Sequence, residues 1–370
     1  MSQRSQAPLH LGAFIFAKVN PRIFKNAFHK QFKIINRQSG YLPRSFWCLD
    51  LPIRPSGSKV LPPPPCRKGG IYVKLGLALS GGTLRGSAHI GVLEALWEAG
   101  IRPDLIAGTS AGSVIASLYA NGLSPATLRR IALSFKGREL IDWTTSTFDI
   151  LKLIALLPLQ YLGFTKDWTR LLPQGFVRGA NFERFLNQLF TLPPTHPKIP
   201  LFITAVDIVS AESIIFTDPL FARGYELGGW VYLPMQDKGA CVRSSCSLPG
   251  LFTPRVIDGR SLVDGAVRMN IPAEVLVQAG CDKVIVVDLH DTEMKNVSAP
   301  PKTFLDVFMR GVDIMQNEII SLQLMDENVF ALQPVIKGVG FTSFDKIAYC
   351  IEQGRQATLA KMDDLKAYLQ

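Results

Sequence analysis

The residue with the clearest chemical potential is Ser110, which stands at the centre of the motif Gly108-Thr-Ser-Ala-Gly112. In a G-x-S-x-G nucleophile elbow, a tight turn between a strand and a helix exposes the serine, and the two glycines let the backbones pack closely. The helix that follows the elbow places its positive N-terminal end behind the serine, where it favours the negative charge that develops on a substrate oxygen. The motif therefore predicts an acyl-transfer nucleophile at Ser110.

A second motif, Ser80-Gly-Gly-Thr-Leu-Arg-Gly86, provides amide groups that no side chain shields. Consecutive glycines such as Gly81 and Gly82 form nests that bind anionic oxygen, either an oxyanion or a phosphate. A nucleotide-binding turn is the alternative, although the spacing of the glycines, including Gly86, is not G-x-G-x-x-G and no Lys-Ser/Thr pair follows. For Arg85 we expect a role in fixing this loop rather than direct contact with substrate.

Ser110 also needs a base, because its hydroxyl does not ionise unaided at neutral pH. In Leu262-Val-Asp-Gly-Ala266, an apolar run that ends in Asp264 and Gly265 places a carboxylate at a strand end, where partial burial would raise its pKa. Most Asp-Gly pairs are simple turns. The alternative base is His290, which follows a predicted strand and would complete a Ser110–Asp264–His290 triad in the order of the α/β-hydrolases.

The segments around these motifs alternate between strand and helix patterns. Strand 72–79 leads into the glycine-rich loop and a helix over 87–98, and strand 104–107 leads into the elbow and a helix over 114–119. A strand, a crossover helix and a second strand imply a parallel pair at the centre of a sheet. Further strands are expected at 201–206, 213–217 and 283–288, and further helices at 180–189, 301–325 and 345–369.

The segment 148–164 is strongly apolar, with one acid and one base, and Pro158 interrupts it. It is too short and too broken to span a bilayer comfortably. Two interpretations remain open: a helix pair packed over the core, or an apolar rim through which a lipid substrate enters.

The basic charge of the chain is confined to residues 1–70, which hold 12 Lys/Arg and a single acid, Asp50. The remaining residues are nearly neutral, so their composition does not indicate a nucleic-acid partner. Residues 1–70 end in the run Pro62–Pro65, which is typical of a stiff linker. This segment is a poorly ordered arm, a cationic and aromatic segment that lies on anionic lipid, or a piece outside the working protein.

The cysteines show neither zinc-ligand spacing nor the pattern of a disulfide framework, which indicates no metal site and a reducing compartment. They are Cys48, Cys66, Cys241, Cys246, Cys281 and Cys350.

Taken together, the motifs 81–86, 108–112 and 264–266 resemble, in order and spacing, those of the patatin-like phospholipases. The resemblance implies that Ser110 and Asp264 form a dyad that acts without histidine. It places the oxyanion hole in the loop that contains Gly81, Gly82, Arg85 and Gly86, with Ala111 as a further donor. Residues 179–186 and 242–250 are also similar to family segments. Ser80 departs from the family, in which many members have another glycine.

The resemblance covers residues 73 to 370, so we expect a basic, poorly ordered N-terminal extension over 1–70 and an acyl hydrolase domain over 71–370. It implies a three-layer α/β/α sandwich with a central, mostly parallel sheet. It also implies a phospholipase A or lysophospholipase type of reaction, through an acyl-enzyme on Ser110 that water, activated by Asp264, then hydrolyses. We expect no cofactor, a lipid or other acyl-ester substrate, a membrane surface as a peripheral partner, and a cytoplasmic location.

Overall fold

The computed structural model describes residues 73–137, 142, 144, 173–222, 229–290, 329–340 and 342–370, together with part of 307–320. All of them lie in the unit Arg67–Gln370. The expectations for residues 1–70 and for the apolar segment 148–164 fall outside the described residues and stay predictions.

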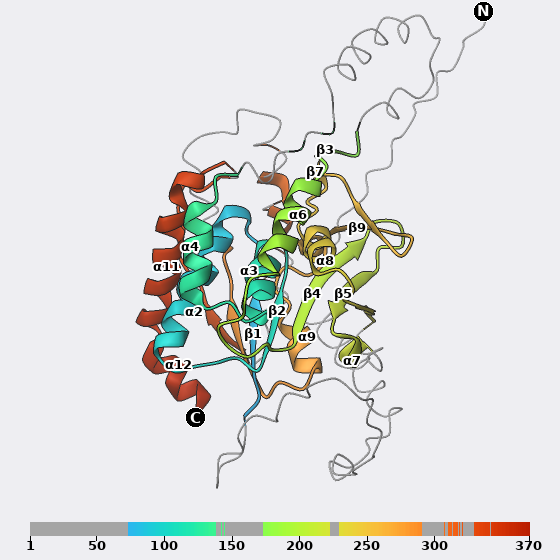
Figure 1. Ribbon diagram of the computed structural model, residues 1–370. Coiled ribbons are helices and arrows are strands. Elements are labelled where there is room, and N and C mark those ends of the chain that lie inside the picture. The colour runs from blue at the N-terminus through green and yellow to red at the C-terminus, as the bar shows by residue number, and fades with distance from the viewer. Residues whose placement is uncertain are drawn as a thin grey trace, which may run out of the picture. The chain divides into compact units, whose positions relative to one another are not determined.

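A mixed, mostly parallel sheet forms the centre of this unit (Figure 1), with the strand order β11–β10–β1–β2–β4–β5–β6. Its strands are β1 (Leu75–Leu79), β2 (Leu105–Gly108), β4 (Leu201–Asp207), β5 (Ser213–Thr217), β6 (Val231–Pro234), β10 (Lys283–Val287) and β11 (Val329–Leu332). Neighbouring strands along this path are parallel, except that β5 runs antiparallel to β4. The carboxyl ends of β1, β2 and β4 therefore meet at one edge of the sheet.

Four further strands lie in the described part of the chain. The strand β9 (Arg260–Asp264) pairs antiparallel with β4, and the short β8 (Arg255–Ile257) pairs with β9. The strands β3 (Gly175–Val177) and β7 (Gly250–Phe252) form a separate parallel pair. The pairing of β9 with β4 matters for function, because it delivers Asp264 opposite Ala205 in the central sheet.

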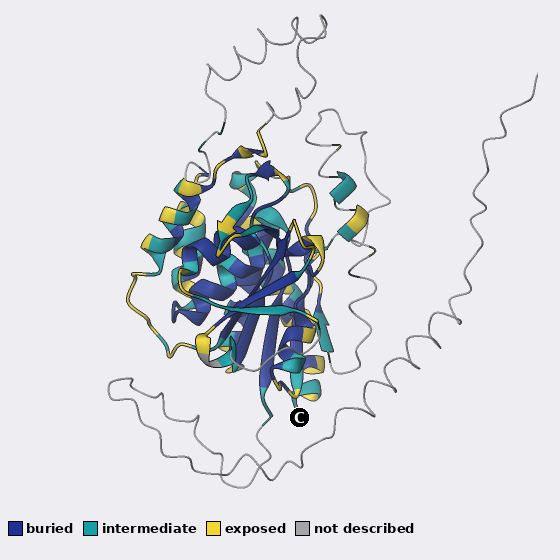
Figure 2. Ribbon diagram, turned by 90° about the vertical axis from the view of Figure 1, so that its right-hand side faces the viewer, coloured by how far each residue is buried: buried dark blue, intermediate teal, exposed yellow. Residues whose placement is uncertain are grey.

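The side chains of β1 alternate between two apolar cores, as expected for a strand buried on both faces. Leu77 and Leu79 belong to the larger core and Ala78 to the smaller one. Figure 2 shows the strands at the centre of the sheet as buried, whereas the edge strand β6 is intermediate. The predicted layers are confirmed, because helices lie on both faces of the sheet (Figure 1).

The helices of the larger core are α2 (Ala88–Glu98), α3 (Ala111–Ala120), α4 (Pro125–Ser134), α6 (Ala180–Leu189), α8 (Lys238–Ser245), α11 (Ile347–Ala360) and α12 (Met362–Leu369). The smaller core lies under α9 (Ala273–Gln278) and the short α7 (Pro219–Ala222). None of the helices in the described ranges has both the length and the apolarity that crossing a membrane requires.

Most of the predicted elements are confirmed, and the helix 180–189 and the strand 213–217 have the expected bounds. The single helix predicted over 345–369 was wrong: α11 and α12 are separate helices. At Lys361 the backbone leaves the helical region (φ −108°, ψ 13°), which ends one helix before the next begins.

Candidate active site

Ser110 lies in a strained turn between the end of β2 and the start of α3. Its φ of 52° and ψ of −124° place it outside the regions that L-residues prefer. The flanking glycines allow this turn: a Cβ on Gly108 would come within 2.6 Å of the Gly112 backbone, and a Cβ on Gly112 would overlap the carbonyl of Leu79. The predicted nucleophile elbow is therefore present, and strain of this kind is concentrated at functional sites.

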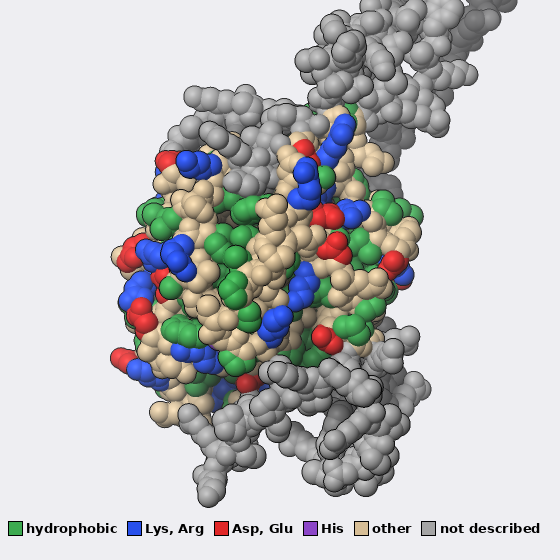
Figure 3. Space-filling view, viewed as in Figure 1, with side chains coloured by type: hydrophobic (Ala, Val, Ile, Leu, Met, Phe, Trp, Pro, Cys, Tyr) green, Lys and Arg blue, Asp and Glu red, His purple; other side chains and the backbone are tan. Residues whose placement is uncertain are grey.

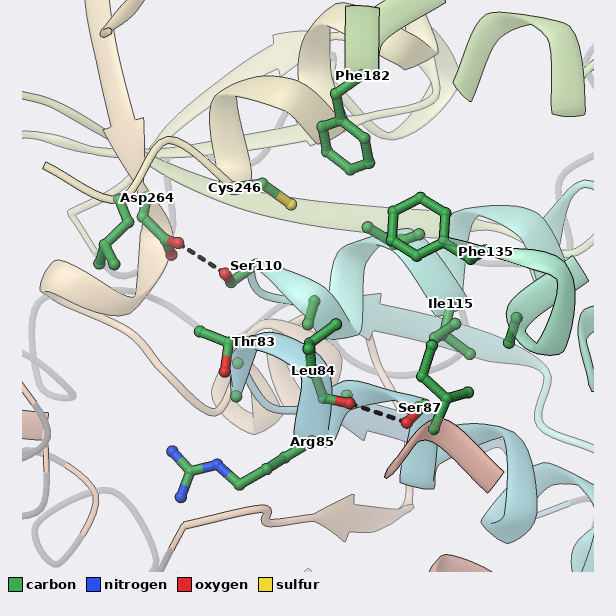
Figure 4. Close-up of a pocket in the computed structure, with 18 of the residues that line it drawn as sticks. Thr83, Leu84, Arg85, Ser87, Ser110, Ile115, Phe135, Phe182, Cys246 and Asp264 are labelled. Carbon is green, nitrogen blue, oxygen red and sulfur yellow. Dashed lines mark hydrogen bonds between the residues drawn. The ribbon is translucent and has the colours of Figure 1, made fainter. Parts of the chain in front are cut away.

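Asp264, the last residue of β9, lies directly beside Ser110 (Figure 4). The Ser110 hydroxyl donates a hydrogen bond of 2.6 Å to Oδ2 of Asp264, while Oδ1 accepts one of 2.9 Å from the Ala266 amide. The backbone amide of Asp264 is held by the carbonyl of Ser247 at 3.0 Å. Hydrogen bonds to the side chain and to the backbone of Asp264 thus fix the carboxylate, with Oδ2 next to the Ser110 hydroxyl.

Burial controls the acidity of this carboxyl group. Asp264 is only 2% exposed, and the loss of water around its charged form raises its pKa to about 7. The hydrogen bonds from Ser110 and Ala266 oppose this rise, because they stabilise the carboxylate. Asp264 is consequently a stronger base than an exposed aspartate and still ionises near neutral pH.

The glycine-rich loop continues from β1 into the 3₁₀ helix η2 (Thr83–Ser87) and faces the serine. The amide of Gly81 donates to Oδ1 of Asn270 at 2.8 Å. The amides of Gly82, Thr83 and Ala111, which line the same cavity as Ser110, make no hydrogen bond to another described residue. These three amides, rather than that of Gly81, are therefore open to an incoming anionic oxygen.

Arg85 and Gly86 take different places in this loop. Gly86 has no room for a side chain, because a Cβ there would overlap that of Ala111, so its absence lets η2 approach the start of α3. The Arg85 side chain lines part of the cavity but extends away from the Ser110–Asp264 pair (Figure 4). This orientation agrees with a role in the loop rather than at the reacting atoms.

The completely buried side chain of His89, in α2, holds the glycine-rich loop in place. Its Nε2 lies 2.9 Å from the carbonyl oxygen of Ser80, and burial lowers the pKa of His89 to about 4. The imidazole is therefore neutral at physiological pH and donates its Nε2 hydrogen to Ser80. The hydroxyl of Ser80 accepts a bond of 3.0 Å from the Leu289 amide, which ties the loop to the end of β10.

Neither His290, the alternative base, nor the thiol of Cys246 takes part in the hydrogen bond between Ser110 and Asp264. His290 is not among the described residues that line the cavity, and Ser110 bonds to Asp264 with no imidazole between them. Cys246 does line the cavity, but burial raises the pKa of its thiol, so it stays protonated. Within the described part of the chain, no three His, Cys, Asp or Glu side chains are grouped as metal ligands.

A cavity of about 210 Å³ opens from Ser110 and is predominantly apolar. Its polar groups lie at one end, around the serine, Asp264 and the glycine-rich loop, whereas α3, α4 and α6 supply apolar walls. On the face seen in Figure 3, hydrophobic side chains gather over α3, between α4 and α6. The site therefore combines a reactive polar end with room for an apolar chain.

The sequence did not reveal two residues that position the site. Asn270 holds the Gly81 amide and is 3% exposed; its one signal is a polar residue between Met269 and Ile271, just after the Asp264 motif. Ser245 of α8 accepts a 2.9 Å hydrogen bond from the Ser110 amide. It lies in the segment 242–250, where the family resemblance was noted but gave this serine no role.

Comparisons with known proteins agree with this geometry. A family model described as patatin-like phospholipase matches residues 77–277, more than half of the chain. Lysophospholipase NTE1 of Mycosarcoma maydis is 30% identical over 220 residues, which are 59% of this chain and 10% of that protein. An NTE family protein of Mycobacterium tuberculosis is 25% identical over 313 residues, 78% of this chain and 46% of that protein. The chain thus spans less than half the length of these relatives.

Among solved structures, VipD from Legionella pneumophila is similar with a TM-score of 0.40 and 16% identity, over 79% of this chain and 67% of that one.

Proposed function

The chain belongs to the patatin-like phospholipase family, and from this premise we propose that it hydrolyses fatty acyl esters of lipids with Ser110 as nucleophile and Asp264 as base. One observation carries the proposal: the 2.6 Å hydrogen bond from the Ser110 hydroxyl to a buried carboxylate, at the polar end of an apolar cavity. A serine hydroxyl that is hydrogen-bonded directly to a carboxylate can perform both halves of an ester hydrolysis.

In the first half, Ser110 Oγ attacks the ester carbonyl carbon while its proton passes to Asp264 Oδ2. The carbon–oxygen bond to the alcohol then breaks, and the departing alcohol takes the proton from Asp264. The acyl group remains on Ser110 as an ester. In the second half, water attacks this ester and gives a proton to Asp264. Ser110 Oγ recovers that proton as the fatty acid leaves, so the enzyme returns to its starting state.

The negative charge that develops on the carbonyl oxygen needs donors in place beforehand. We assign this role to the amides of Gly82, Thr83 and Ala111, with the N-terminus of α3 contributing its dipole. Gly81 supports them indirectly, since its own amide is bonded to Asn270. Loss of one oxyanion donor lowers kcat by about 10²–10³ in comparable acyl-transfer enzymes.

A lipid surface is the partner that this site favours. Two segments that line the cavity also carry exposed apolar side chains. These side chains are Val267 of η5 (Gly265–Val267), and Ile314 and Met315 beside the lining residue Val312. Phe176 of β3 is likewise 45% exposed and lies on the strand paired with β7, whose Phe252 lines the cavity. We propose that these side chains dock the protein peripherally on membrane, with a cytoplasmic location.

Incubation with a single-chain phospholipid, followed by mass spectrometry of the products, tests the hydrolase proposal. The wild-type protein should release free fatty acid, and Ser110→Ala should lower the rate at least about 10³-fold. Equal product from both proteins would refute it.

Sedimentation with anionic vesicles tests the membrane proposal: the double change Ile314→Glu and Met315→Glu should weaken binding but leave hydrolysis of a soluble short-chain ester unchanged. Vesicle binding that equals that of the wild type would exclude these side chains from docking.

A further inference from the structure

Three helices each contribute one apolar stripe to the lining of the same cavity, and the side chains of these stripes also belong to the larger core. The spacing of three or four residues along each stripe is that of a single helix face. On α3 the stripe starts at Ser110, and the three stripes contain Val114 and Leu118 of α3, Leu128, Ile131 and Ala132 of α4, and Phe182, Phe185 and Leu189 of α6. The lining of the cavity, which we call the channel, therefore extends along α3 away from the nucleophile.

Leu118 and Leu128 line the channel near the C-terminal end of α3 and the start of α4, on the side away from Ser110. Leu118 lies eight residues beyond Ser110, which corresponds to about 12 Å along a helix axis. The two leucines are 2% and 1% exposed, so neither side chain faces bulk solvent. The connection between α3 and α4 brings them to the same end, since α4 returns antiparallel to α3 after a short turn.

A channel with a reactive polar end and apolar walls fits a single extended hydrocarbon chain. A carbon–carbon bond of about 1.5 Å advances such a chain by roughly 1.3 Å per carbon, so about nine or ten carbons fit between Ser110 and Leu118. We propose that Leu118 and Leu128 set the acyl-chain length that this enzyme prefers. This inference rests on the proposed function, because it describes the acyl group bound at the same serine.

The preference follows from burial. Each methylene that enters the channel is worth about a fourfold gain in kcat/KM. The gain continues up to an acyl chain of about ten carbons, the decanoyl group, and stops where the chain reaches Leu118 and Leu128. Longer chains must bend or displace these leucines, so their kcat/KM levels off or falls.

The test is kcat/KM for a series of single-chain esters, from hexanoyl through decanoyl and myristoyl to stearoyl, with wild type and Leu118→Ala. The shortened side chain lengthens the channel, so the myristoyl-to-decanoyl ratio should rise about tenfold. Leu96→Ala is the matched control: Leu96 of α2 is 1% exposed in the same core but does not line the cavity. Its chain-length profile should equal that of the wild type.

Leu128→Ala provides a second variant from the opposite wall, should Leu118→Ala fail to fold, and it should shift the profile in the same direction. If the correctly folded variants keep the wild-type profile while Ser110→Ala abolishes hydrolysis, the leucines do not set chain length and the hydrolase assignment stands. If Leu96→Ala shifts the profile as much, the effect reflects general loosening and the proposal is wrong. If the wild type hydrolyses no ester of the series, the proposed function itself fails.

Discussion

Replacing Asp264 with asparagine should abolish turnover and, at neutral to alkaline pH, stabilise the folded protein. Both effects have one cause, the burial of a carboxylate where water cannot reach it. Asparagine has the same shape, and its Oδ1 can still accept the hydrogen bond from the Ala266 amide. The substitution therefore removes the charge and the base while it keeps the local packing.

The size of the stabilisation follows from the pKa. In the unfolded chain the carboxyl group of Asp264 has a pKa of about 3.9, whereas burial raises it to about 7 in the fold. Between these values the folded protein binds the proton more tightly, so the contribution of Asp264 to stability falls as pH rises from about 4 to 7. Three pKa units correspond to about 4 kcal/mol, which is the full cost above pH 7.

Chemical denaturation of both proteins across this pH range provides the measurement. The stability of Asp264→Asn minus that of the wild type should grow by about 2–3 kcal/mol between roughly pH 5 and 8. His89, whose lowered pKa makes stability rise with pH over roughly 4 to 6.5, acts alike in both proteins and cancels in the difference. A difference that stays constant with pH, or that shrinks as pH rises, would refute the assignment of a buried carboxyl with a raised pKa.

Three further expectations follow from the same site. The value of kcat/KM should rise with pH and level off above about 7, as Asp264 loses its proton; a profile that is flat from pH 5 to 9 would contradict Asp264 as base. Asn270→Ala should lower kcat by about tenfold or more with little change in KM, because the Gly81 amide loses its partner and the loop beside the oxyanion loses its anchor; unchanged kcat in the folded variant would remove Asn270 from this role. His290→Ala should retain activity within about a factor of three. A loss of activity as large as that of Ser110→Ala would instead support a Ser110–Asp264–His290 triad.

The elbow and the glycine-rich loop could be predicted from sequence because their geometry is local. A strand, a turn with glycines at fixed positions and a helix involve only neighbouring residues, and the strain at Ser110 follows from that turn. The raised pKa of Asp264 was also foreseen, although only partial burial was expected. The reason for the difference is the antiparallel pairing of β9 with β4, which encloses the carboxyl group almost completely.

The approach of Asp264 to Ser110 could not be worked out from spacing, since 154 residues separate them and the family resemblance supplied the pairing. The same limit applies to Asn270, which reaches Gly81 across 189 residues. That contact occupies the Gly81 amide, whereas the amides of Gly82, Thr83 and Ala111, which we propose as the oxyanion donors, make no hydrogen bond to another described residue. Contacts of this kind depend on the register between strands that are far apart in the sequence. The periodic pattern of apolar residues within one strand does not predict them.

The most direct test of the central claim is to identify the residue that carries the acyl group during turnover. The protein is mixed with a single-chain acyl ester, quenched within one turnover and digested, and the peptide that contains Ser110 is analysed by mass spectrometry. We expect an acyl ester on Ser110 in the wild type, and none in Ser110→Ala or in Asp264→Asn. Turnover with the acyl group on another residue, or with a Ser110→Ala protein as active as the wild type, would contradict it.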